Sequence, residues 1–337
     1  MQNGKSHILA IGLSLGISLP FIGCGPAEKK QPDKVEHPDN AEPTGKPKQP
    51  DESGETGKVK QPDEIDLSQL KPNPFADFKW EVSGNLVSII ECKASGIVVL
   101  PDTIAGFPVG RIGSLVSDGN TLPDQLKDGN AIPDGVTTLV IPESVTSIGD
   151  GAFYGCKSLV RLKIPDKVTS IGKYAFYGCE NLESVMIGSG LTGIGDGAFY
   201  GCRSLTNLEL PDSLVYIQQR AFQYCTNLRG ITIPPVVNSI ANSAFDDCPS
   251  LTSITVSEKN RTFSSENGVL INKARQSLLR CPQGRDGAYQ VPAKVTHISD
   301  SAFYRCSKLT SVNIPEGVTT IGNYAFRECS MMNTVTI

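Results

Sequence analysis

Histidine is scarce in this 337-residue sequence, which contains only three. His7 and His37 lie in an N-terminal region with little resemblance to a folded domain. His297 is therefore the only histidine that could take part in catalysis within a folded domain. General acid–base and nucleophilic mechanisms near neutral pH depend heavily on histidine. No Ser–His–Asp grouping and no phosphate-binding loop can be assembled from the remaining residues. The sequence therefore predicts a protein that is not an enzyme and needs no cofactor.

A surplus of positive charge is also missing, because the formal net charge is -4 and the pI is about 5.5. Nucleic acid is therefore excluded as a partner, since its binding requires clustered Lys and Arg that displace counterions. Aromatic residues make up only 7% of the chain, and Trp80 is the single tryptophan. Glycine and proline, in contrast, are plentiful. This mixture favours a turn-rich, repetitive β structure over a helical bundle.

No apolar run reaches the roughly 20 residues that a membrane-spanning helix needs. Residues 1–23 are instead typical of a lipoprotein signal peptide, with a positive charge before an apolar stretch over 8–19. The residues Phe21–Cys24 resemble a bacterial lipobox, which predicts that Cys24 is lipidated; ordinary signal-peptidase cleavage nearby is the alternative. Gly25 is not the Asp that retains lipoproteins at an inner membrane. We therefore expect a lipid anchor in the bacterial cell envelope, at the outer membrane, with the folded part periplasm-facing or surface-exposed.

Residues 24–75 are rich in Pro, Lys and Glu, and the tetrapeptide Lys-Gln-Pro-Asp occurs three times in them. With so few apolar side chains, this segment cannot offset the entropy cost of ordering by burial. We therefore predict a disordered stalk that holds the folded part away from the membrane. A signalling motif within the segment is the alternative.

An internal repeat of about 23 residues dominates residues 76–337. In one unit, Leu159, Leu162 and Ile164 have the spacing of a short strand whose alternate side chains turn inward. Pro165 ends this strand, because proline has no N–H for the ladder. One unit is too small to bury its own apolar side chains, so several must stack around a shared core. The repeat is marked by a column of seven cysteines: Cys156, Cys179, Cys202, Cys225, Cys248, Cys306 and Cys329.

The second half of each unit has a different spacing. Val168 and Ile171 form another inward edge, and Ala175, Phe176 and Cys179 fit one face of a short helical turn. The predicted fold class is therefore a β-rich α/β solenoid, with a parallel strand face and short helical turns.

The motif Leu-x-x-Leu-x-Ile-Pro-x-x-Val-x-x-Ile-Gly-x-x-Ala-Phe-x-x-Cys, as in Leu159–Cys179, resembles the BspA-like leucine-rich repeat family. The resemblance implies an N-terminal β-hairpin cap over residues 76–101 and an enlarged coil over 257–290. A polar insert over 114–134 departs from the family pattern. The chain stops at Ile337 on the strand of a new coil, so either another element covers this edge or the product is shortened.

The cysteine column invites a disulfide or metal interpretation. Coils about 4.8 Å apart would bring successive cysteines within disulfide range, but parallel stacking points their side chains the same way. A metal ion needs ligands that converge on one point. We therefore predict buried free thiols and no metal site. Gly149–Gly151 and Gly195–Gly197, both Gly-Asp-Gly, lack the dense carboxylates of a calcium loop and are interpreted as turns.

The outward side chains of the repeat strands are the candidate binding face, because solenoids use such arrays as extended binding surfaces. Plain solvated positions are the alternative. The mixed, mostly uncharged character of these residues disfavours an electrostatic partner. The candidates are Arg161, Lys163, Ser184, Met186, Asn207, Glu209, Thr232 and Thr255.

The family resemblance implies a function class for such a face. Some similar proteins attach to host matrix proteins or to other cells, which implies adhesion or recognition with an unknown protein or glycan ligand. That ligand could be host matrix, another cell or an envelope component, and the lipid would provide the membrane contact. A lipid-tethered spacer without a specific ligand is the alternative.

Overall fold

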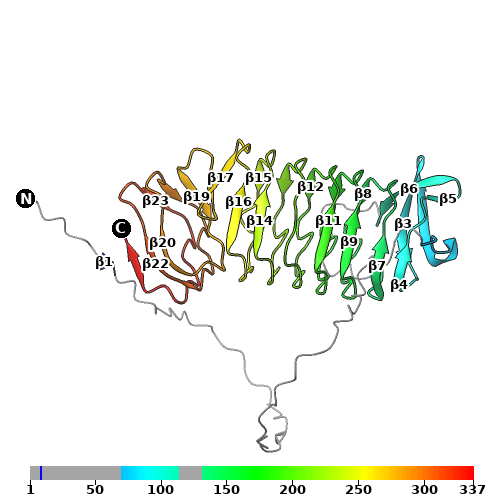
Figure 1. Cartoon of the computed structure of the whole chain (residues 1–337), viewed down its shortest axis with the longest axis horizontal. Coiled ribbons are helices and arrows are strands. Elements are labelled where there is room, and N and C mark those ends of the chain that lie inside the picture. Colours follow the sequence, from blue (N-terminus) through cyan, green and yellow to red (C-terminus); the bar gives the residue numbers. More distant parts are fainter. Residues whose placement is uncertain (1–7, 10–69, 114–130) are drawn as a thin grey trace, which may run out of the picture. The chain divides into compact units, whose positions relative to one another are not determined.

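The computed structural model describes residues 8–9, 70–113 and 131–337. In this part the chain winds into a stack of coils that follow one another from the N-terminal strands in cyan to the C-terminal strands in red (Figure 1). Most of the predicted signal peptide, Cys24, the stalk up to residue 69 and the polar insert up to residue 130 lie outside the described residues. In the described part, no helix has the length and apolar character needed to cross a membrane.

The N-terminal end of the stack begins with a 3-10 helix, η2 (Phe75–Asp77), and an antiparallel hairpin of β2 (Phe78–Ser83) and β3 (Leu86–Cys92). Gly84 in the hairpin turn has a φ of 60°, a left-handed conformation that glycine adopts without strain. β3 pairs in parallel with β6 (Phe107–Ile112), so the hairpin is part of a solenoid wall and β2 is its edge strand. The two other strands of this end are β4 (Gly96–Val99) and β5 (Thr103–Ile104).

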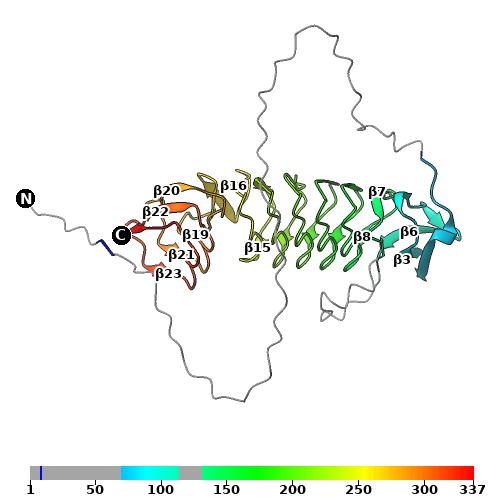
Figure 2. The same cartoon turned by 90° about the horizontal axis from the view of Figure 1, so that it is seen from below.

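Most repeat coils contribute one strand to each of two parallel walls, which lie on opposite sides of the stack (Figure 2). The longer strands are β7 (Val136–Val140), β9 (Arg161–Ile164), β11 (Ser184–Ile187), β14 (Gly230–Ile233) and β16 (Ser253–Val256). The shorter strands are β8 (Ser147–Ile148), β10 (Ser170–Ile171), β12 (Gly193–Ile194), β13 (Tyr216–Ile217) and β15 (Ser239–Ile240).

Strands of neighbouring coils pair at steps of one repeat. Leu162 lies beside Val185 in the wall of longer strands, and Ile171 lies beside Ile194 in the other wall. Equivalent side chains of successive coils therefore stack on one another, and the inward ones form columns. Parallel strands with apolar side chains repeating in this way bury the core that no single coil could form.

The phenylalanines form the most regular of these columns. Phe153, Phe176, Phe199 and Phe222 are fully buried, with successive ring centroids 4.8, 5.0 and 5.5 Å apart and ring planes within 10° of parallel. A stacked aromatic pair contributes about 0.5–1.5 kcal/mol beyond the burial of its area. The column therefore stabilises the spacing of the coils as well as the core.

The predicted short helical turns are not confirmed, since η2 is the only helix among the described residues. Ala175, Phe176 and Cys179 are buried, but they lie in hydrogen-bonded turns. The N–H of Phe176 donates to the carbonyl oxygen of Ala198 in the next coil at 2.7 Å, instead of to a carbonyl four residues earlier. Gly178 interrupts the segment with a φ of 69°. The fold is therefore a β-solenoid, without the α part of the predicted class.

One predicted repeat strand is also missing. Residues 205–210 contain no assigned strand, so the wall of longer strands is interrupted between β11 and β14. The inward and outward alternation persists there, because Leu208 is buried while Asn207 and Glu209 are exposed. The side chains keep their directions although the strand ladder is broken.

The enlarged coil forms an antiparallel sheet of three strands, β17 (Phe263–Glu266), β18 (Val269–Asn272) and β19 (Ser277–Arg280). After this coil the longer wall resumes with β20 (Gly287–Gln290), β22 (Leu309–Asn313) and β24 (Thr334–Thr336), and the shorter with β21 (His297–Ile298) and β23 (Thr320–Ile321). β1 (Ile8–Leu9) pairs antiparallel with β24.

The enlarged coil also divides the hydrophobic core. One buried cluster extends from Phe78 to Leu270, and a second extends from Val269 to Cys329. The two clusters meet within β18, where Leu270 belongs to the first and Val269 to the second. Polar contacts also join the coils at this point, as where the backbone N–H of Ile254 donates to the carbonyl oxygen of Gly268 at 2.8 Å.

Candidate functional site

The predicted binding face is most regular on β9 and β11. Arg161 lies beside Ser184 and Lys163 lies beside Met186, while Leu162 between them points into the core. Neighbouring strands are about 4.8 Å apart, so these four outward side chains form one compact group. We call the outward side chains of the longer strands and of residues 207 and 209 the long-strand face.

Charge on this group is partly compensated within the chain. The ammonium of Lys163 lies 3.2 Å from a carboxylate oxygen of Glu143, and both side chains are more than half exposed. Such an exposed pair contributes about 0–1 kcal/mol to stability. Beside it, Met186 is 66% exposed. Methionine is soft and adaptable, and it is common on surfaces that bind other proteins.

The remaining candidates lie further along the stack. Thr232 and Thr255 occupy equivalent positions on β14 and β16, and their hydroxyl oxygens are hydrogen-bonded at 2.8 Å. Asn207 and Glu209 are exposed in the coil without a strand. The structure therefore divides the long-strand face into a β9–β11 part and a β14–β16 part, joined by an irregular coil.

The seven column cysteines are all buried, and each is a free thiol. The thiol of Cys179 donates to the carbonyl oxygen of Phe153 at 3.1 Å, and that of Cys202 donates to Phe176 at 3.2 Å. Cys225, Cys248 and Cys329 repeat this contact with the phenylalanine of the preceding coil. Burial raises the pKa of the Cys248 thiol to about 12, so little nucleophilic thiolate forms at neutral pH.

A column of tyrosines accompanies these turns, and the sequence analysis did not single it out. The rings of Tyr154, Tyr177 and Tyr200 are stacked with centroids 4.7 and 4.5 Å apart. Burial, with Tyr177 close by, raises the pKa of Tyr200 to about 12. The three residues recur in the pattern Ala-Phe-Tyr-Gly-Cys, so their 23-residue spacing could have revealed them. Because the ring faces cover one another, we interpret the column as packing that supports the turns.

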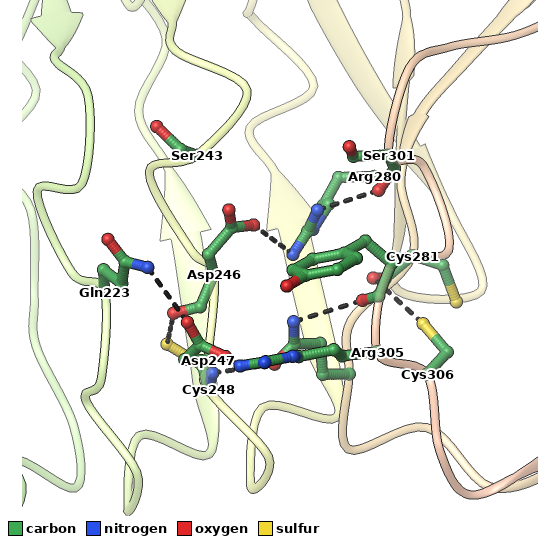
Figure 3. A network of polar contacts seen from close by, with 12 residues as sticks. Gln223, Ser243, Asp246, Asp247, Cys248, Arg280, Cys281, Ser301, Arg305 and Cys306 are labelled. Atoms are coloured by element: carbon green, nitrogen blue, oxygen red, sulfur yellow. Dashed lines mark hydrogen bonds and ion pairs between the residues drawn. The ribbon is translucent and has the colours of Figure 1, made fainter. Parts of the chain in front are cut away.

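A buried ion pair joins the enlarged coil to the coil before it (Figure 3). The guanidinium of Arg280 lies 2.5 Å from a carboxylate oxygen of Asp246, and it donates to the carbonyl oxygen of Ser301 at 2.8 Å. The two side chains are 6% and 16% exposed. Burial raises the pKa of the Asp246 carboxyl, and the charge of Arg280 opposes this rise.

A second set of ion pairs runs beside the first. Arg305 contacts Asp247 and, at 2.6 Å, Glu328, while the amide of Gln223 donates to Asp247 at 2.9 Å. Asp247 and Arg305 both have a φ of 57°, at a turn position that Gly178 occupies in an earlier coil. Charged residues at a position suited to glycine were a sequence signal that the repeat analysis overlooked.

These two sets of contacts link coils on either side of the division in the core. Asp246 and Asp247 belong to the coil before the enlarged one, whereas Ser301 and Arg305 belong to the coil after it. Most charged groups in the cluster are paired with one another, so the arrangement is closed and structural. We assign it the role of holding the C-terminal coils on the stack.

The described residues contain no arrangement suited to metal binding or histidine chemistry. Within them no group of three His, Cys, Asp or Glu side chains is close enough to hold a metal ion. His297 is exposed on β21, with its ring Nδ1 2.7 Å from the hydroxyl of Thr296. Asp150 of the first Gly-Asp-Gly accepts a hydrogen bond from the backbone N–H of Lys173 at 2.7 Å. This carboxylate therefore serves a contact between coils.

Comparison with known proteins matches the repeated part of the chain to a family. A model described as BspA type leucine-rich repeat region matches residues 134–251 and 288–337, in six copies. No curated protein matches the chain in sequence.

Solved structures provide further likenesses. A leucine-rich cell surface protein from Faecalibacterium prausnitzii A2-165 is 29% identical with a TM-score of 0.56, and the match covers 80% of this chain and 76% of that one. The pneumococcal vaccine antigen PcpA is 22% identical with a TM-score of 0.62, over 77% of this chain and 68% of that one. At that identity, PcpA supports the fold alone.

Proposed function

Since the repeated part of this chain belongs to the BspA-type leucine-rich repeat family, we propose that the protein is a non-enzymatic scaffold for adhesion or recognition at the bacterial cell surface. Family members are generally protein-interaction scaffolds. The similar Faecalibacterium protein carries the description of a cell surface protein, which supports the same location here. The proposed ligand is a protein, bound on the long-strand face.

The exposed group on β9 and β11 is the observation that carries this proposal. Met186 leaves 66% of its surface exposed in the middle of a regular parallel wall, where the fold itself needs only the inward residues. It lies beside the Lys163–Glu143 pair, whose opposite charges offset each other. An apolar side chain inside a polar rim is the usual composition of a protein-binding surface. This composition favours a ligand-binding surface over a spacer without a ligand.

Replacing Lys163, Met186 and Glu209 together with alanine should weaken capture of the ligand by about tenfold or more, because truncating an interface anchor typically costs over 1 kcal/mol. The full chain would be tested against immobilised extracellular matrix proteins and envelope proteins by surface plasmon resonance. Circular dichroism should be unchanged, since these three side chains are exposed.

A matched control replaces three exposed residues away from the long-strand face, Lys167, Gln218 and Asn238, with alanine. Its binding should equal that of the wild type. If the first variant also binds normally, the long-strand face is not the binding surface. If the wild type binds nothing in either panel, the spacer interpretation is favoured instead.

We propose further that Cys24 carries the lipid that tethers the protein to the outer membrane. The support is the lipobox-like sequence ahead of a polar stalk, and Cys24 lies outside the described residues. In cells fed an alkyne analogue of palmitate, the wild type should become labelled and Cys24→Ser should not. Label that persists in Cys24→Ser would exclude this residue as the anchor.

A further inference from the structure

The outer edge of β2 is free in the part of the chain that the structure describes. β2 is the last strand of its sheet and pairs only with β3, which lies between it and β6. In the hairpin Lys79 pairs with Glu91 and Trp80 pairs with Ile89, so Ile90 between them has no partner on β2. This residue is on β3, so β2 itself remains a regular strand. A regular edge strand is a template for pairing with another strand.

The side chains of β2 alternate between an apolar and a charged face. Phe78 is 6% exposed and belongs to the core, and Trp80 and Val82 follow at alternate positions on the same face. Trp80 is 37% exposed and Val82 is 45% exposed, so the apolar face extends beyond the end of the core. Lys79 and Glu81 lie on the opposite face and are exposed.

This strand is complementary to a second copy of itself. When two β2 strands are aligned antiparallel about Trp80, each Lys79 lies opposite Glu81 of the other copy, and Phe78 lies opposite Val82. The two tryptophans meet on the two-fold axis. One alignment therefore places opposite charges together on one face and apolar side chains together on the other.

We propose that two copies of this chain associate end to end through their β2 strands, forming a two-fold symmetric dimer. The pairing satisfies the free backbone groups of both edges and joins the two short-strand walls into one sheet. It covers Trp80 and Val82 of each copy with their counterparts. An interface of this kind is self-complementary and closed, so association stops at two copies. It uses none of the long-strand face.

Trp80 is the only tryptophan in the chain, so its fluorescence reports directly on the proposed interface. The full chain should sediment as a dimer at micromolar concentration in analytical ultracentrifugation. Its tryptophan emission should shift to longer wavelength on dilution, as Trp80 becomes exposed to water in the monomer. The midpoint of this shift should agree with the dissociation constant from sedimentation.

Charge reversal tests the alignment. Lys79→Glu or Glu81→Lys alone puts like charges opposite each other at two symmetric places, which should weaken the dimer by about tenfold or more. Lys79→Glu combined with Glu81→Lys restores opposite charges and should restore the dimer. A mixture of the two single variants should also form dimers. Lys79→Glu carries negative charges at both positions and Glu81→Lys carries positive charges at both, so opposite charges face each other in the mixed pair.

A control accounts for the ion pair that Lys79 makes within the chain. Its ammonium lies 3.8 Å from Glu91, and Lys157 makes a similarly exposed pair with Glu180 at 3.7 Å in a middle coil. Lys157→Glu should therefore leave the dimer unchanged. The proposal is overturned if the wild type sediments as a monomer. This includes a monomer whose tryptophan emission does not change with concentration because residues 1–69 cover Trp80. It is also overturned if both single variants dimerise normally.

Discussion

Arg280→Met should lower the free energy of unfolding of the C-terminal coils by roughly 3 kcal/mol, because removing one partner of a buried ion pair leaves the other charge uncompensated. The carboxylate of Asp246 would remain mostly buried, without the guanidinium that lies 2.5 Å away in the wild type. The carbonyl oxygen of Ser301 would also lose its donor. Methionine keeps much of the volume, so lost charge and hydrogen bonding would account for the effect.

The position of Arg280 predicts how this loss would appear. In a solenoid most contacts join neighbouring coils, so losing a buried contact at one coil weakens the coupling between the two sides. The core already divides near this coil, with separate clusters before and after it. Urea unfolding of Arg280→Met should therefore show an early transition from the C-terminal coils. Hydrogen exchange should be faster after residue 290 and unchanged around Phe176.

The deficit should depend on pH in a definite direction. Burial and the neighbouring Asp247 raise the pKa of Asp246, and Arg280 opposes this rise, so the variant should raise that pKa further. A carboxyl with a raised pKa in the folded state contributes stability below its unfolded pKa of about 3.9, and this is lost as the pH rises through the folded value. The variant should therefore be closer to the wild type in acid than at pH 7.

Arg275→Met is the matched control in the same enlarged coil. Arg275 pairs with Glu266 at 3.6 Å, but both side chains are more than a third exposed. Its replacement should change stability by less than about 1 kcal/mol. Equal effects of the two variants would show that the buried ion pair does not hold the C-terminal coils.

The repeat pattern predicts much of this fold because every coil has the same requirement. Leu162 and Ile164 point inward, and Lys163 points outward, wherever strands alternate. The helical turns were predicted wrongly because the spacing of Ala175, Phe176 and Cys179 fits a helix as well as a turn. The decisive hydrogen bonds run to the next coil, as from Phe176 to Ala198, and no single repeat contains both partners.

The Arg280 cluster could not be predicted for a related reason. Arg280 and Asp246 are 34 residues apart in sequence, and the enlarged coil between them follows no repeat that would bring them into register. The candidate binding face was easier to predict from the sequence, since the 23-residue spacing alone aligns Lys163 with Met186. The break at Asn207 is not encoded in that spacing, because its coil keeps the apolar pattern of the others.

The proposed dimer would change how the proposed binding face works. Two copies joined at β2 present two long-strand faces on one assembly. When both can engage a multivalent ligand, the second contact forms at a high effective concentration, and avidity can exceed either single affinity by 10²–10⁴. Weak binding by each face would then be enough for adhesion.

A shared dry interior for successive coils is the claim on which the rest depends, and thiol reactivity tests it in every coil. Nine of the ten cysteines lie in the described residues, all of them buried and free. Attack on a disulfide reagent requires both access and a thiolate. Burial raises the pKa of Cys248 and of Cys329 from 9.0 to about 12, which lowers the thiolate fraction at pH 8 by about a thousandfold.

The measurement is a thiol titration of the full chain with a disulfide reagent at pH 8, before and after denaturation in guanidinium chloride, with mass spectrometry to identify the labelled residues. The account predicts that the native protein reacts at Cys24 or not at all, and that denaturation releases nine more thiols. Rapid native labelling of Cys179, Cys202 and Cys225 would contradict it, because cysteines on the outside are incompatible with stacked coils around one core.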